Sequence, residues 1–120
     1  MEREKFVQLM AEEFEQLLEL NRVKGRDYAG DEDALRNFKE AAVRLGVSEE
    51  QVWAVYADKH WQAILSYCRT PEAVVSEPIE GRVRDLLVYG FLLLGLVSER
   101  KSKEAQRRAD AVREGMGVER

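Results

Sequence analysis

The fold is decided by residues 76–97, a run of apolar residues preceded by carboxylates, which reads SEPIEGRVRDLLVYGFLLLGLV. Pro78 suits the first turn of a helix, where the missing N–H of proline costs nothing, and Ser76 or Glu77 can cap the free amides. Residues 86–97 are apolar nearly all round. The stretch therefore predicts a long helix that is buried on all sides, with its acidic start at the mouth of a helix–helix cleft.

The rest of the chain also predicts helices. Residues 3–24 have an amphipathic pattern, and its apolar stripe is close to a 3.5-residue repeat that could also pair with a partner subunit. A short helix is expected over 33–45, capped by Asp33 and ended by Gly46. Residues 48–51 resemble a capping box for a further helix that runs to about residue 69. The sequence therefore predicts an all-α bundle of about four or five helices.

The composition fits one helical domain. The chain has 120 residues, of which 45% are apolar and 35% charged, and this allows one modest core and argues against disorder. We expect a single domain over residues 1–97 and a charged helical extension over 98–120, helical toward Glu114. That extension carries seven Lys or Arg and five Asp or Glu, whereas the whole chain has a formal net charge of −4. Nothing in this balance suggests a nucleic-acid partner.

The cellular compartment is expected to be the cytoplasm. Cys68 is the only cysteine, so no disulfide can form within the chain and a reducing compartment is favoured. The charged N-terminus lacks a signal-peptide pattern. The apolar run at 86–97 is too short to span a bilayer, so no membrane partner is expected.

Carboxylates and a lysine form the candidate site. Asp58 and Lys59 lie in the middle of the third expected helix, and Glu77, Glu80 and Asp85 lie at the start of the last one. Hard oxygen ligands suit Mg²⁺ or Mn²⁺, and Lys59 could bind phosphate. Water attack on a phosphoanhydride would then be assisted by the metal. Acidic residues on helices are also common on solvated surfaces, so that alternative stays open.

The loop over residues 24–33 is a second candidate for ligand contact. It carries Lys24, Arg26, Asp27 and Tyr28, and binding residues concentrate on loops. The two basic side chains could bind phosphates. A solvated turn anchored by the tyrosine is the alternative.

Taken in order, these residues resemble a known family. The blocks that carry the resemblance are Lys24 to Tyr28, Asn37-Phe38, Asp58-Lys59-His60, and Glu77-Pro78-Ile79-Glu80 through Asp85 to Tyr89. Over roughly residues 15–98 the chain is similar to small phage-encoded proteins of the nucleotide-modification-associated family, which look like relatives of the MazG-like all-α NTP pyrophosphatases. The resemblance implies a bundle that oligomerises in the host cytoplasm, a Mg²⁺ site, and nucleoside triphosphates as substrates.

The resemblance also implies roles for individual residues. The implied catalytic residues are Asp58, Lys59, Glu77 and Asp85, and the implied metal ligands are Asp58, Glu77, Glu80 and Asp85. The implied substrate contacts are Lys24, Arg26, Asp27, Tyr28, Asn37 and Tyr89. The chain departs from the pattern of these families at Gly81 and Arg82, where acidic residues are expected.

The leading interpretation is a Mg²⁺-dependent nucleoside triphosphate pyrophosphohydrolase, or a nucleotide-binding protein, that works as a homodimer or homotetramer. Two alternatives stay open. One is a catalytically inactive relative that binds a nucleotide or a host protein. The other is a structural helical oligomer in which Asp58 and Lys59 pair across helices and residues 86–97 form a subunit interface. Gly81 is informative, because glycine early in a helix costs up to ~1 kcal/mol relative to alanine. Either a ligand or a second helix would approach it closely.

Overall fold

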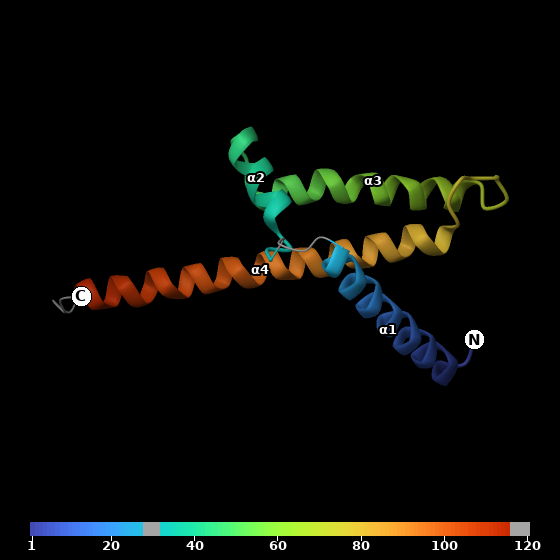
Figure 1. Ribbon diagram of the computed structural model, residues 1–120, viewed down its shortest axis with the longest axis horizontal. Helices are drawn as coiled ribbons and strands as arrows, with labels where there is room; N and C mark the ends of the chain where they lie inside the picture. The colour runs from blue at the N-terminus through green and yellow to red at the C-terminus, as the bar shows by residue number, and fades with distance from the viewer. Residues whose placement is uncertain (28–31, 116–120) are drawn as a thin grey trace. The chain divides into compact units, whose positions relative to one another are not determined.

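The computed structural model describes residues 1–27 and 32–115, with side chains described for 1–23 and 32–115. The helices are α1 (Arg3–Asp27), α2 (Arg36–Leu45), α3 (Glu49–Arg69) and α4 (Ile79–Gly115), and the described residues contain no strand (Figure 1). The prediction of an all-α protein is confirmed. The chain divides into two compact units, Met1–Ala34 and Leu35–Arg120.

The first unit contains a single helix. α1 covers the region that the pattern over 3–24 predicts. Its apolar stripe is half exposed, since Phe6, Met10 and Phe14 each keep 48% of their accessible surface. One helix cannot bury an apolar face against itself, so α1 considered alone leaves much of this stripe uncovered.

Local signals set the boundary between α2 and α3. α2 ends at Gly46, whose φ of 68° is the left-handed conformation that glycine adopts easily. The Gln51 amide donates to Ser48 Oγ at 3.1 Å, and the Ser48 amide donates to Gln51 Oε1 at 2.9 Å. These reciprocal bonds confirm the predicted capping box.

The start of α2 differs from the prediction. The helix begins at Arg36, and Leu35 takes the N-cap position without a side-chain cap. The Leu35 carbonyl accepts hydrogen bonds from the amides of Phe38 and Lys39. Leu35 is buried there, so core packing sets the start of this helix in place of the expected Asp33 cap.

The core of the second unit lies where α2, α3 and α4 meet. Its buried residues are Leu35, Phe38, Ala41, Ala42, Val52 and Leu96, and Trp53, Tyr89, Leu92 and Leu93 pack against them. A methyl group placed on Gly95 would lie 3.6 Å from the Leu35 methyls. That distance is ordinary contact, so Leu35 rests directly against the backbone of α4 at Gly95.

A tight turn and a short connection join α3 to α4. The Ala73 amide donates to the Thr70 carbonyl at 3.1 Å, and Pro71 lies at the second position of that turn, which its fixed φ favours. This bond closes a tight turn directly after α3. α4 begins at Ile79, directly after Pro78, so the expected start of the long helix holds to within a residue.

The expectation that residues 86–97 are buried on all sides is wrong for the single chain. Leu96 is 1% exposed, but Leu87, Phe91 and Leu94 are 46%, 51% and 63% exposed. Leu94 and Leu96 are two positions apart, so at about 100° per residue they leave the helix on nearly opposite sides. Leu96 therefore packs in the core of the second unit, and the other elements of that unit leave Leu94 exposed.

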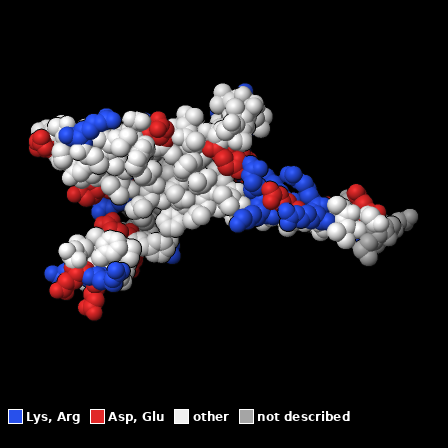
Figure 2. Space-filling model, turned by 180° about the vertical axis from the view of Figure 1, so that it is seen from behind, with Lys and Arg blue, Asp and Glu red and all other residues white. Residues whose placement is uncertain are grey.

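The charged extension is helical, as expected. α4 continues to Gly115, and beyond Leu96 no described residue of α4 is buried. Figure 2 shows Lys and Arg side chains gathered over this part of the helix. Alternating charge on a solvated helix stabilises it locally, as Arg113 and Asp110 do at 3.4 Å.

Candidate functional site

The predicted site corresponds to the seam between α3 and α4, where His60 meets α4. Its Nδ1 lies 3.9 Å from Asp85 Oδ2, and its ring centroid lies 4.6 Å from that of Tyr89. Next along the seam, Trp53 Nε1 donates to the main-chain carbonyl of Tyr89 at 2.7 Å. The seam therefore places one imidazole, one carboxylate and one phenol within contact of each other.

Tyr89 has a packing role in this seam. Its ring meets Phe38 edge-on at a centroid distance of 6.3 Å. Burial raises the pKa of Tyr89 above its ordinary value, and the nearby Tyr56 and Asp85 raise it further. Tyr89 is thus a neutral, partly buried phenol that supports the core. The substrate contact that the sequence predicts for Tyr89 stays a prediction.

The four predicted metal ligands are solvent-accessible but do not gather. Asp58, Glu77 and Glu80 are exposed, and the Asp85 side chain keeps 47% of its surface. Among the residues whose side chains are described, no three His, Cys, Asp or Glu side chains lie close enough together to hold a metal ion. The described side chains of a single chain therefore do not bring these carboxylates together, and the Mg²⁺ or Mn²⁺ site stays a prediction.

Helix geometry explains why Asp58 does not join Asp85. His60 faces α4, and Asp58 lies two positions earlier in α3, which is about 200° around the helix. Asp58 and its neighbour Lys59 are exposed. The sequence pattern predicted Asp58 as the residue of α3 that meets the acidic start of α4, and it did not predict His60. The signal that could have found His60 is its spacing of four residues from Tyr56 and from Ile64, which places the three side chains on the same face of a helix.

Glu77 lines a small pocket at the α3–α4 connection. The pocket has a volume of about 110 Å³, and Arg82, one of the two departures from the family pattern, also lines it. Side chains of Ser66, Tyr67 and Thr70 complete its polar lining. The space suits ordered water rather than a nucleotide, since ligand pockets usually measure about 300–1,000 Å³.

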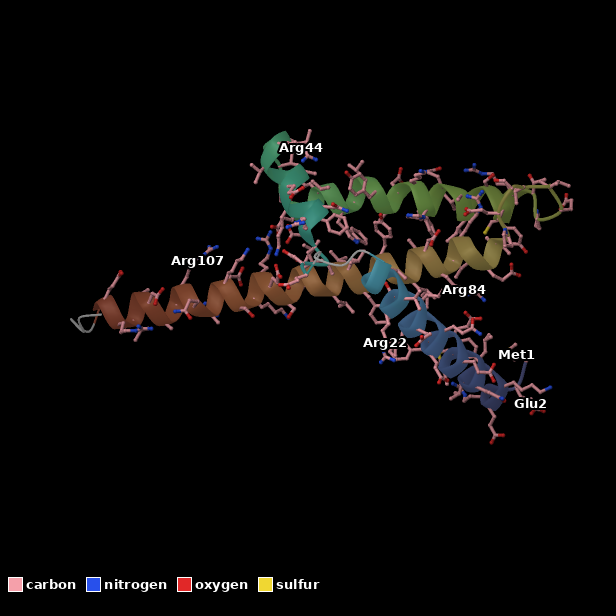
Figure 3. All side chains as sticks on the ribbon, viewed as in Figure 1. Met1, Glu2, Arg22, Arg44, Arg84 and Arg107 are labelled. Atoms are coloured by element: carbon pink, nitrogen blue, oxygen red, sulfur yellow. The ribbon has the colours of Figure 1, made fainter. Side chains whose placement is uncertain are left out.

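A larger pocket lies where α2, the start of α3 and the extension of α4 meet. It measures about 460 Å³, and Lys39, Arg100, Lys103 and Arg107 line it together with Glu49, Glu50 and Glu104. Figure 3 labels Arg107 on α4. The two signs of charge nearly balance, so the pocket has no strong preference for an anion.

Ion pairs hold the walls of this pocket. Arg100 donates to both Glu50 oxygens, at 2.8 and 2.6 Å, and Lys39 Nζ lies 3.1 Å from Glu99 Oε2. The hydrogen bonds from Arg100 hold the pKa of Glu50 below its ordinary value. The pairs join residues about 50 and 60 positions apart, which no local sequence pattern reveals.

The remaining predicted substrate contacts are placed only in part. Asn37 lies exposed in the first turn of α2. The side chains of Lys24, Arg26 and Asp27, and the whole of Tyr28, lie outside the described residues. Their predicted contacts with substrate stay predictions.

Comparison of the chain with protein-family models, with curated proteins and with solved structures finds no match. None of the described helices has a segment that is both long and apolar enough to cross a membrane.

Proposed function

We propose that the chain is the subunit of a helical homo-oligomer, in which a second copy covers the exposed apolar side of α4. The observation that carries this proposal is one continuous face on α4. We call it the apolar face of α4, and its members are Val83, Leu87, Gly90 and Leu94. Their spacing of three or four residues places them on one side of the helix.

The exposure of the apolar face supports its being covered by a partner. Its three large side chains, Val83, Leu87 and Leu94, are 39–63% exposed, and Tyr89 and Leu96 on the opposite side of α4 belong to the core of the second unit. Burial of apolar surface contributes about 25 cal/mol per Å². Covering this face therefore favours association, and a contiguous apolar patch of this kind is typical of an interaction site.

Light scattering on the full chain tests the proposal. We expect a dimer or larger oligomer at micromolar concentration, and a monomer for Leu94→Glu, because the added charge would be desolvated in the interface. Val55→Glu is the matched control, since Val55 is 70% exposed on α3 away from the apolar face. A monomeric wild-type chain would overturn the proposal.

The second candidate function is nucleotide binding of the MazG-like type, with Mg²⁺-dependent pyrophosphohydrolysis as its catalytic form. The observation that favours it is the accessibility of Asp58, Glu77 and Asp85, none of which pairs with a Lys or Arg among the residues with described side chains. These carboxylates are available to a cation. Since one chain does not gather them, the remaining ligands would come from a second copy or from the nucleotide phosphates.

A thermal-shift titration with each of the four nucleoside triphosphates, with and without Mg²⁺, tests the second candidate. We expect a rise in Tm that needs both components and that Asp85→Asn removes. Asp110→Asn is the control, because Asp110 lies in the extension of α4. Pyrophosphate release then separates hydrolysis from binding. No shift with any of the four nucleotides would rule this candidate out.

A further inference from the structure

We infer that the pocket at the α3–α4 connection binds a small zwitterion, a molecule that carries one carboxylate and one ammonium group, such as the smallest α-amino acids. The pocket has a volume of about 110 Å³, and Glu77 and Arg82 both line it. Its walls come from α3, α4 and the segment between them, so the whole pocket belongs to the second unit. The inference is independent of self-association through the apolar face.

The two charged residues of this pocket do not pair with each other. Among the residues with described side chains, neither Arg82 nor Glu77 forms an ion pair or a hydrogen bond through its charged group. Arg82 is partly buried, and burying a charge is costly unless the charge is paired. Its guanidinium can donate two parallel hydrogen bonds to one carboxylate, and the Glu77 carboxylate can accept from an ammonium group.

Three residues with hydroxyl groups complete the polar lining. Ser66 and Tyr67 belong to the end of α3, and Thr70 is its C-cap residue. A hydroxyl group both donates and accepts hydrogen bonds, so these residues can donate to a bound carboxylate or accept from a bound ammonium group. The pocket therefore offers a partner for every polar group of a small amino acid.

Size and charge together select the ligand. Because a water molecule takes about 30 Å³ of liquid, the pocket has room for about four waters, or for a molecule of about five non-hydrogen atoms. A simple anion would lie near Glu77 and leave that carboxylate unpaired. A simple cation would do the same to Arg82. Only a ligand that carries both charges pairs with both side chains, and each like-charge contact disfavours the simpler ions.

An NMR titration of the full chain tests the inference, with glycine, acetate and methylammonium as probes. We expect glycine to shift the amide signals of residues 66–82 and to bind in about the millimolar range, because so small a ligand makes few contacts. Acetate and methylammonium should each bind about tenfold more weakly, since each leaves one charged side chain unpaired. Acetate that binds as tightly as glycine would show a plain anion site, and no binding of glycine would show a pocket for water only. Either result would overturn the inference.

Substitutions in the pocket give a second readout. Arg82→Met and Glu77→Gln should each weaken glycine binding by about tenfold. Arg69→Met and Glu72→Gln are the matched controls and should leave it unchanged, because both residues are exposed near the same end of α3 and do not line the pocket. Ala63→Leu should abolish binding while both charges stay, since the larger side chain fills the pocket. Glycine binding that persists in Arg82→Met and in Ala63→Leu would place the ligand elsewhere and overturn the inference.

Discussion

The indole nitrogen of Trp53 donates to the main-chain carbonyl of Tyr89 at 2.7 Å, so a side chain of α3 is fixed to the backbone of α4. A hydrogen bond of this kind fixes the axial position of α3 relative to α4, because the acceptor is part of the backbone of α4. The rings of His60 and Tyr89 contact each other at an interplanar angle of 45°. The same seam holds His60 Nδ1 at 3.9 Å from Asp85 Oδ2.

Replacing Trp53 by Phe should lower the free energy of unfolding by about 1 kcal/mol beyond the effect of lost apolar area. The variant removes the indole donor and keeps an aromatic ring in the seam. Urea denaturation measures the change. Trp61→Phe is the control, because Trp61 is 48% exposed; equal losses in the two variants would show that the hydrogen bond contributes nothing.

The two sides of α4 should respond differently to truncation. Leu96→Ala should cost about 2–5 kcal/mol, because the side chain is 1% exposed and its removal leaves a cavity. Leu94→Ala should change stability by less than about 0.5 kcal/mol, when both are measured at concentrations where the chain is monomeric. Similar losses would mean that Leu94 is buried within the chain in solution.

Gly81 and Gly46 should give opposite results when changed to alanine. A Cβ on Gly81 meets nothing within 4 Å, so Gly81→Ala should raise the free energy of unfolding by up to ~1 kcal/mol. Gly46→Ala should lower it by about 1–2 kcal/mol, since its φ of 68° disfavours a side chain.

Gly81→Ala also decides between the two explanations of that glycine. A Cβ at position 81 would have open space around it, so close packing within the described chain does not explain why this position is a glycine. A stabilised variant with weaker nucleotide binding would support a ligand over Gly81. A destabilised variant would show that a helix of another copy packs there.

The pair of Glu50 and Arg100 should make stability depend on pH in the acid range. The hydrogen bonds from Arg100 lower the pKa of Glu50 in the folded chain from its ordinary 4.5. The contribution is therefore present above pH 4.5 and is lost as the pH falls through the lowered pKa. Urea denaturation of wild type and Arg100→Met between pH 7 and pH 3 should give curves that converge at low pH.

The control for this pH series is Arg113→Met, whose partner Asp110 lies within the same helix turn. That variant should show little effect at any pH, because exposed pairs within a helix contribute weakly. A gap between wild type and Arg100→Met that stays constant down to pH 3 would contradict an ionic origin.

Short-range features of this chain were predictable from sequence. The capping box at Ser48 and Gln51 and the left-handed end at Gly46 depend on residues within a few positions of each other. Helix type follows from the same local patterns. The start of α2 was missed, because burial of Leu35 against α4 outweighs the capping ability of Asp33.

Long-range features were less predictable. The composition of residues 86–97 indicates burial but not which side of the helix α3 will take. A difference of two positions separates the exposed Asp58 from His60 in the seam. The pairs Lys39–Glu99 and Glu50–Arg100 join distant parts of the chain. Such contacts arise from tertiary packing, and a single sequence carries no direct signal for them.

The length of α4 has a consequence for amide hydrogen exchange. The helix spans 37 residues, but its buried contacts end at Leu96. Amides near Tyr89 and Leu96 should exchange only when the second unit unfolds, whereas those after Arg107 should exchange through local opening of single turns. One uninterrupted helix should therefore show a gradient of protection along its axis, and its carboxyl-terminal turns should be lost first on heating.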